Sequence, residues 1–290
     1  MTTLGPNTTP GTYEFQVLDL LHDPSFGRWQ QTQIDSYINL ARKQLVMDTG
    51  CLRALQPSYT TQGQEQYFFG QICGAAITVG GAGYTAPTIS FSGGGGSGVA
   101  ATLGVSGGAV SSITFTNFGS GYSSVPSYLI SDATGSGAQI SLGICNVNTY
   151  DILGVHLIWG TERYTLQWRP FRLFSAWMRP FVAAAYQRQP AAWSTYGDTS
   201  FFLGPCPDQS YQTEWDTVIL PTPFPVGDTT TVDPIPVIAQ DPIPFYAAHL
   251  AKSNAQNYGE AEAFLSQYRR RLAEVVSVYV GRIPDIYQES

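Results

Sequence analysis

Gly81-Ala82-Gly83-Tyr84, followed by Pro87, returns 38 residues later as Gly119-Ser120-Gly121-Tyr122, followed by Pro126, so the centre of the chain holds an internal repeat. A second motif, Gly96-Ser97-Gly98-Val99-Ala100, returns as Gly135-Ser136-Gly137-Ala138-Gln139 with an offset of 39 residues. Alternating runs such as Thr88-Ile89-Ser90-Phe91 lie between the motifs, and glycine turns bound them, a pattern typical of short strands. The sequence therefore predicts two copies of a small β unit.

The repeat region also differs in composition from the rest of the chain. It holds more than half of the 30 glycines, and Asp132 is its only charged residue. This abrupt change predicts an inserted Gly-rich β-repeat domain at residues 73–145. The surrounding domain is then split into residues 1–72, which include a mobile arm at residues 1–11, and residues 146–290.

The motif residues of the repeat have two possible roles. We expect each tyrosine ring to cover a glycine turn beside a proline, which is a structural role; the alternative is that Tyr84 and Tyr122 stack on a glycan. The residues concerned are Gly81, Gly83, Tyr84, Pro87, Gly119, Gly121, Tyr122 and Pro126.

Helical signals are clearest outside the repeat. Thr12 can cap a short helix, and Thr32 with Asp35 matches a capping box for a second helix that ends at Gly50. Near the C-terminus, Asp241 and Pro242 can begin a helix to about residue 258, and an apolar stripe predicts another over residues 259–279.

Strands are expected between the repeat and these last helices. Residues 152–159 and 164–168 flank Gly160-Thr161 and predict a hairpin, and a short helix is expected from Pro170 to Met178. Residues 191–196, 201–203 and 211–220 favour further strands, and residues 221–241 favour an extended loop. Together these patterns predict an α+β fold: a helical bundle core with a long C-terminal helix and β-hairpins, plus an inserted small all-β domain built of two repeats.

Composition favours a protein that works through protein contacts. Hydrophobic residues make up 43% of the chain and charged residues only 12%, about half the usual share. A surface poor in charge and rich in aromatic side chains suits burial between proteins. The net charge of −7 disfavours a nucleic-acid binder held by phosphate neutralisation, but not a channel through which DNA slides.

The four cysteines are widely spaced and form no C-x-x-C pair, so buried free thiols are favoured over disulfides. They are Cys51, Cys73, Cys145 and Cys206. The N-terminus lacks the basic and apolar regions of a signal peptide, and no run approaches the length of a membrane span. We therefore expect a protein that is made and assembled in the cytoplasm, with no membrane partner.

Nothing local in the sequence points to catalysis, a metal or a cofactor. His22, His156 and His249 fall in different predicted elements, and His156 in its apolar run is interpreted as a core or interface residue. The glycine run that ends at Gly98 lacks the lysine of a phosphate-binding loop. The chain is therefore expected to be no enzyme, with no cofactor.

Residues across most of the chain outside the repeat resemble the head-to-tail connector adaptors of tailed phages, in particular the P22-type adaptor of short-tailed phages. The first group of matching residues is Leu20-Leu21-His22-Asp23, Gly27-Arg28-Trp29, residues 35–42 and residues 49–53. The others are residues 152–155 with Arg163 and Leu166, residues 190–196 and 205–211, and residues 244–252 with Ala263, Phe264 and Tyr268. The Gly-rich repeat resembles β modules inserted in many phage structural proteins, and it departs from the basic adaptor pattern.

The resemblance implies a helical core and a ring, twelvefold in this family, beneath the portal protein. Such a ring seats the tail nozzle or tail-tube protein and continues the channel for double-stranded DNA, which it does not bind specifically. The expected location is the head–tail junction of the virion, after assembly in the host cytoplasm.

We expect the C-terminal helix and tail to contact the portal protein, with Tyr279, Val280, Ile283, Ile286 and Tyr287 as candidates. The nozzle-facing surface is expected around residues 193–202 or in the loop at 221–241. Two other functions stay open: a glycan-binding tail or surface module, and a virion cell-wall hydrolase that uses an unrecognised carboxylate pair.

Overall fold

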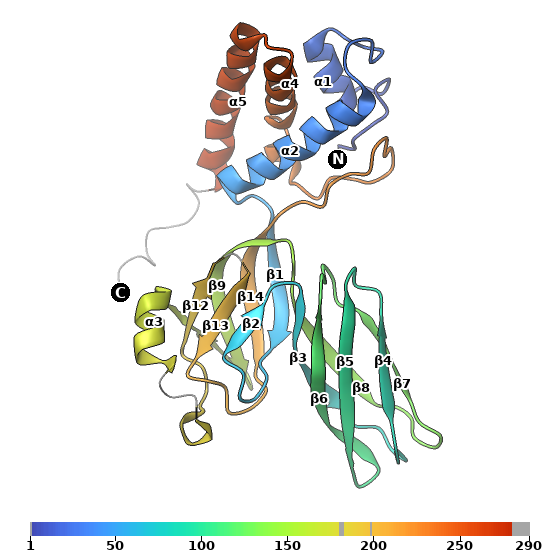
Figure 1. Cartoon of the computed structure of the whole chain (residues 1–290), viewed down its shortest axis with the longest axis vertical. Helices are drawn as coiled ribbons and strands as arrows, with labels where there is room; N and C mark the ends of the chain where they lie inside the picture. Colours follow the sequence, from blue (N-terminus) through green and yellow to red (C-terminus); the bar gives the residue numbers. More distant parts are fainter. Residues whose placement is uncertain (1, 180–182, 198, 280–290) are drawn as a thin grey trace. The chain divides into compact units, whose positions relative to one another are not determined.

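The computed structural model describes residues 2–179, 183–197 and 199–279, which fall into two compact units. A helical unit comprises Met1–Arg53 and Leu220–Ser290, and a β unit comprises Ala54–Ile219. Strands make up 36% of the structure and helices 27%. The predicted helical bundle core is therefore wrong, because the segments taken for hairpins on a helical core build a large β core of their own (Figure 1).

The helical unit contains α1 (Tyr13–Leu21), α2 (Gln31–Thr49), α4 (Ile243–Asn254) and α5 (Tyr258–Tyr279). As predicted, Thr12 caps α1, and Gly50 ends α2 in a left-handed conformation with φ of 60°. The predicted capping box at Thr32 and Asp35 is wrong, because Gln30 and Gln33 form the box. Asp35 instead accepts the N–H of Gly227 at 2.9 Å. Its side chain therefore serves tertiary packing rather than the helix end.

Two long segments are tied to these helices. Residues 2–11, where we expected a mobile arm, include the fully buried Leu4, and Thr3 forms a β-bridge with Val232. The extended segment after Ile219 contains only a short 3₁₀ helix, Val237–Ala239, as the loop prediction implied. Its Phe224 bonds through both backbone groups to the Asn39 side chain of α2, with N–H donated at 2.9 Å and the carbonyl accepting at 3.0 Å.

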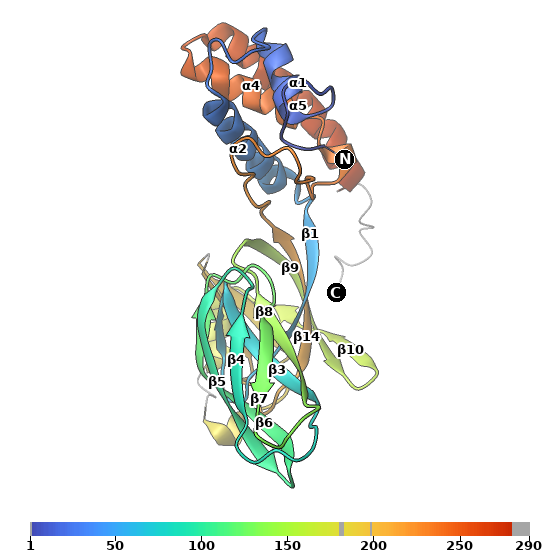
Figure 2. The same ribbon diagram turned by 90° about the vertical axis from the view of Figure 1, so that its right-hand side faces the viewer.

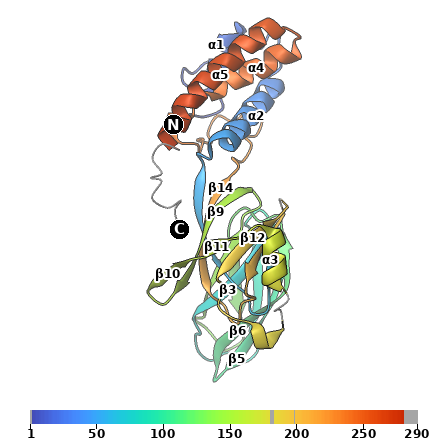
Figure 3. The ribbon, with the colours of Figure 1, turned by 90° about the vertical axis from the view of Figure 1, so that its left-hand side faces the viewer.

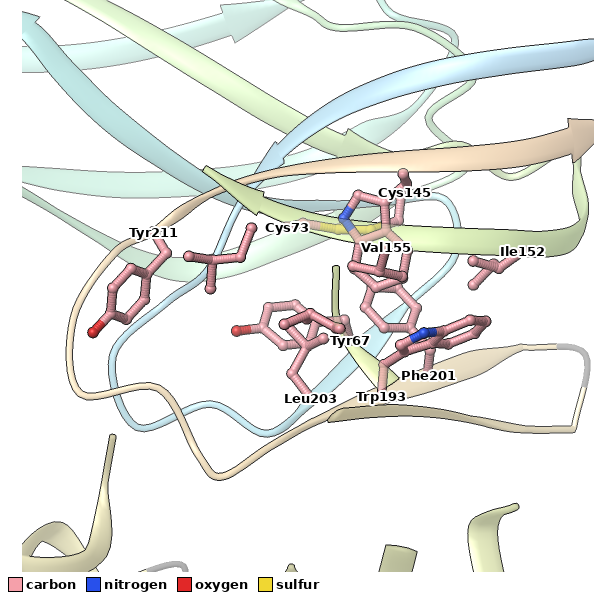
Figure 4. Close-up of a cluster of buried hydrophobic side chains, with 12 residues drawn as sticks. Tyr67, Cys73, Cys145, Ile152, Val155, Trp193, Phe201, Leu203 and Tyr211 are labelled. Carbon is pink, nitrogen blue, oxygen red and sulfur yellow. A yellow bond between two sulfur atoms is a disulfide. The ribbon is translucent and has the colours of Figure 1, made fainter. Parts of the chain in front are cut away.

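The β unit contains a sandwich of two four-stranded sheets. One sheet has the order β1 (Arg53–Tyr59), β14 (Gln212–Ile219), β9 (Thr149–Trp159), β10 (Glu162–Thr165). The other has the order β11 (Gln167–Trp168), β12 (Ala192–Tyr196), β13 (Ser200–Gly204), β2 (Gln66–Phe68). Side chains from both sheets share one core, in which Phe201 lies 5.3 Å from Tyr67 and 4.1 Å from Trp215 between ring centroids (Figure 4). The predicted hairpin at Gly160-Thr161 is confirmed as β9–β10.

A short helix, α3 (Phe171–Trp177), covers the outer face of the second sheet and confirms the prediction for residues 170–178 (Figure 3). Trp193 and Phe201 point into the sandwich, while their neighbours Ala192 and Phe202 point outward and pack on Phe174. Because side chains alternate along a strand, the two faces of this sheet serve different clusters.

The repeats form a module of six strands, which we call the repeat module (Figure 2). Its strands are β3 (Gln71–Val79), β4 (Thr88–Ser92), β5 (Ser97–Ser106), β6 (Ala109–Ser120), β7 (Ser127–Ser131) and β8 (Gln139–Cys145). β3 pairs with β8, β4 with β7 and β5 with β6, all antiparallel. A shift of about 39 residues along the sequence carries β3 onto β6, β4 onto β7 and β5 onto β8. Under this shift the β3–β8 pair corresponds to the β5–β6 pair, and the β4–β7 pair joins two equivalent strands. The two repeats are thus interleaved rather than stacked as separate units.

The first and last strands of the module are joined covalently by a disulfide between Cys73 and Cys145 (Figure 4). The prediction of free thiols is wrong for this pair and confirmed for Cys51 and Cys206, which are buried. The two bonded residues are 72 positions apart, and only the antiparallel pairing of β3 with β8 brings them together. The repeat module is part of the β unit, which comprises Ala54–Ile219. The boundaries of this unit therefore differ from the composition changes at residues 73 and 145.

Candidate interaction surfaces

The three histidines lie in or next to three different elements of the described residues 2–179, 183–197 and 199–279. His22 ends α1, the His156 ring is 3.1 Å from the Thr165 hydroxyl, and the His249 ring is 2.8 Å from the Ala261 carbonyl oxygen. No group of three or more His, Cys, Asp or Glu side chains in this part of the chain is placed to hold a metal ion.

The two motif tyrosines each cover a glycine of the other repeat. Tyr84 lies against Gly135, where an added Cβ would come within 2.4 Å of the ring, and its hydroxyl accepts the Ala138 N–H at 3.1 Å. Reciprocally, Tyr122 lies against Gly96, where an added Cβ would come within 2.6 Å of the ring. The rings are only 5% and 2% exposed, which leaves almost no face on which a sugar could stack.

The motif glycines allow the chain to turn beneath these rings. Gly81 and Gly119 have φ of 64° and 67°, and Gly83 and Gly121 have φ of 77° and 78°. These left-handed values are strained for any residue with a Cβ. Pro87 and Pro126 immediately precede β4 and β7, a position where the missing N–H does not interrupt a ladder.

Asp132, the single charge of residues 73–145, fastens the two repeats together. Its carboxylate accepts the backbone N–H groups of Thr85 and Ala86 from the first repeat, at 3.1 and 2.8 Å. It also accepts those of Thr134 and Gly135, both at 2.9 Å. These hydrogen bonds, that from Thr134 foremost, hold the pKa of Asp132 well below its usual range. The Asp132 carboxylate therefore makes structural hydrogen bonds within the repeat module.

A groove of about 780 Å³ lies between the repeat module and strand β1. It is lined mainly by hydroxyl and amide side chains and by no Asp, Glu, His, Lys or Arg. Its lining includes Tyr59, Thr60, Gln62, Thr78, Ser112 and Gln212.

Two strongly exposed apolar side chains of the β unit lie on α3. Leu173 is 51% exposed and Trp177 73%, and the exposed Arg169 and Arg172 lie just before them in the chain. Arg169, Leu173, Phe174, Trp177 and Met178 line a groove of about 350 Å³. We call Arg169, Arg172, Leu173 and Trp177 the α3 patch. No prediction from the sequence included this patch, although the spacing of Leu173 and Trp177 on a short helix was a signal for one shared face.

The predicted portal contacts lie at the end of α5. Tyr279 is the last described position of that helix, and Val280, Ile283, Ile286 and Tyr287 lie outside the described residues. Further back, the apolar stripe of α5 is used within the helical unit. Ala261, Tyr268 and Val275 are buried, and the Tyr268 hydroxyl donates to Asp48 of α2 at 2.6 Å.

No protein-family model matches the chain, and no curated protein matches it. Among the described residues, no helix combines the length and the apolar character needed to cross a membrane.

Proposed function

We propose that this chain is a structural protein of a tailed phage virion, a head-to-tail connector adaptor that assembles as a ring, dodecameric by resemblance. In this proposal the ring lies under the portal protein, joins it to the tail nozzle or tail-tube protein and continues the DNA channel. The observation that carries the proposal is the α3 patch, because soluble monomers rarely expose adjacent tryptophan and leucine side chains. Such a surface is typical of a protein–protein interface, where tryptophan and arginine are enriched.

Two further observations support a connector over an enzyme or a glycan-binding module. Within the described residues the three histidines lie in or next to different elements, Asp132 is engaged in structural hydrogen bonds, and the motif tyrosines are buried. The acidic balance of the chain, −7, also suits a lumen along which double-stranded DNA slides without specific binding. The resemblance of residues outside the repeat to phage adaptors adds the location, the head–tail junction.

Binding to the portal protein encoded by the same phage tests this proposal. Full-length chain is mixed with assembled portal, and co-sedimentation is compared with that of a chain ending at Gly281 and of Arg270→Glu, a change at an exposed residue of α5. We expect the full chain and R270E to co-sediment with the portal and the shortened chain to be lost from the pellet. Absence of portal binding by the full chain contradicts the proposal, and binding by the shortened chain contradicts the assignment of the contact to Ile283, Ile286 and Tyr287.

A further inference from the structure

The α3 patch is built on a rigid platform, so its side chains are presented in a fixed arrangement. Phe174 is 1% exposed and packs on Ala192 and Phe202 of the sheet beneath. Beyond the helix, Arg179 forms an ion pair with Glu65 at 3.0 Å and lies 5.1 Å from the Phe202 ring centroid. A surface held in place in this way loses little conformational entropy when a partner covers it.

The patch carries uncompensated positive charge in an acidic chain. Residues 160–190 contain five arginines and one acid, whereas the remainder of the chain contains nine lysines and arginines and twenty acids. In the part of the chain that the structure describes, Arg172 has no carboxylate partner, and the Arg169 guanidinium bonds only to the Gln167 side chain, at 2.6 Å. We therefore expect the surface that binds this patch to carry Asp or Glu side chains, which outnumber Lys and Arg in the remainder of the chain.

The charge also decides which symmetry is possible. A twofold dimer through this patch would bring Arg169 and Arg172 of one copy against the same residues of the other, and like charges across an interface disfavour it. The patch must therefore meet a different surface. A contact between two different surfaces of identical chains repeats head to tail, and it closes into a ring when the rotation allows.

A surface of complementary character lies on the opposite face of the same sandwich. On β9, Ile152 points into the core, so its neighbours Asp151 and Leu153 lie on the outer face of the sheet. Leu153 and the nearby Tyr150 are both 48% exposed. Asp151 accepts only the N–H of Ile152, whereas Glu214 on the neighbouring strand is paired with Arg163 at 3.0 Å. We call Tyr150, Asp151 and Leu153 the β9 strip.

We propose that the α3 patch of one copy of this chain binds the β9 strip of a second copy, with Trp177 and Leu173 packing on Tyr150 and Leu153 and with Arg172 facing Asp151. This inference rests on the proposed function, since it names the contact by which the ring would form. The two surfaces lie on opposite faces of one sandwich, so the contact leaves a free patch at one end of the pair and a free strip at the other. Further copies can then add in the same way.

Sedimentation equilibrium of the purified full-length chain, from micromolar concentration to the solubility limit, tests the contact. We expect species larger than a dimer to grow with concentration. Trp177→Ser, Arg172→Glu and Asp151→Arg should each weaken association by at least about tenfold. Arg270→Glu and Leu129→Ser, which alter an exposed arginine and an exposed leucine elsewhere, should leave it unchanged.

Mixing the two charge-reversed chains gives the sharper result. An equimolar mixture of R172E and D151R should recover association, because the reversed patch of one then faces the reversed strip of the other. A wild-type chain that stays monomeric throughout, R172E association equal to wild type, or a mixture that does not recover overturns the inference. So does binding of the patch to anionic phospholipid vesicles without self-association. The sedimentation measurement uses neither portal nor virion. A negative result for portal binding therefore does not contradict the contact between copies, and a negative result for self-association does not contradict portal binding.

Discussion

Arg42 of α2 and Asp233 of the extended segment form a bidentate ion pair across 191 positions of the chain. Nη2 lies 2.9 Å from Oδ1 and Nε 3.0 Å from Oδ2, and both side chains are almost fully buried. The Tyr13 hydroxyl donates to the same carboxylate at 2.7 Å, and the Arg42 guanidinium lies 3.8 Å from the Phe224 ring centroid. One buried charge pair therefore holds the first helices and the extended segment together.

Removing one partner of this pair should strongly destabilise the helical unit. Asp233→Asn leaves the Arg42 guanidinium buried without a counter-charge, and loss of a buried partner costs about 3–5 kcal/mol. Chemical denaturation monitored by circular dichroism gives the change in unfolding free energy. The matched control is Asp228→Asn, a half-buried acid of the same segment that accepts turn hydrogen bonds from Thr230 and Thr231, for which we expect a much smaller effect. A change below about 1 kcal/mol for D233N would show that the pair does not hold the unit together.

The interleaved packing of the repeats predicts a steric requirement at Gly135. Gly135→Ala places a Cβ within 2.4 Å of the Tyr84 ring and 2.6 Å of its Cα, so the module must shift, and we expect a loss of at least about 2 kcal/mol. Gly107→Ala is the control, since it has φ of 60° and open space around it. Its cost should be only the strain of the left-handed backbone, about 1 kcal/mol. Equal melting temperatures for the two variants would contradict the reciprocal contact.

Asp35 makes the helical unit sensitive to pH. Burial, together with the neighbouring carboxyl of Glu14 and against the hydrogen bond from Gly227, raises the pKa of Asp35 to about 7. The folded state thus holds this proton more tightly than the unfolded state, whose aspartate pKa is about 3.9. Its contribution to stability is complete below about pH 4 and is lost as the pH rises to about 7, by up to about 4 kcal/mol.

Asp35→Asn removes this titration and should flatten the dependence of unfolding free energy on pH between 4 and 7. The amide stays neutral, so we expect the variant to equal or exceed wild-type stability at pH 8. Asp19→Asn, an exposed acid of α1, serves as the control. If wild type and D35N keep parallel pH profiles, Asp35 is not the titrating group.

The disulfide predicts a thiol count and a stability effect. Alkylation of unfolded, unreduced protein should modify two cysteines, Cys51 and Cys206, and mass spectrometry of peptides should recover Cys73 linked to Cys145. Closing a loop of 72 residues is worth at most about 4 kcal/mol of unfolded-state entropy, so C73S/C145S should melt at a lower temperature. Four alkylated cysteines in the unreduced chain would rule out the bond.

Local signals predicted local structure well. The Thr12 cap, the Gly50 helix end and the turn at Gly160-Thr161 each depend on a few neighbouring residues, and the structure contains all three. Pairings between distant segments could not be predicted in the same way. The alternating patterns around Trp193 and Trp215 are equally compatible with hairpins on a helical core and with a sandwich. Only the shared cluster around Phe201 distinguishes the two arrangements.

Repetition in the sequence predicted the β module but not its interleaving. The motifs show that Tyr84 and Tyr122 are equivalent. The sequence pattern is the same whether each tyrosine packs on a glycine of its own repeat or on one of the other repeat. The same limit applies to Cys73 and Cys145, whose spacing has no pairing rule. The sequence did not predict the α3 patch, because whether Trp177 is exposed depends on which residues Phe174 packs against. The portal contacts at Ile283, Ile286 and Tyr287 stay predictions.

Labelling of complete virions and of tail-stripped particles with antibody against this chain, followed by gold and electron microscopy, is the most direct test of the connector proposal. A particle whose tail has been stripped exposes the head–tail junction, and we expect gold there and nowhere else on the virion. Gold on fibres or at the distal tail tip would contradict a connector and favour a surface-binding role.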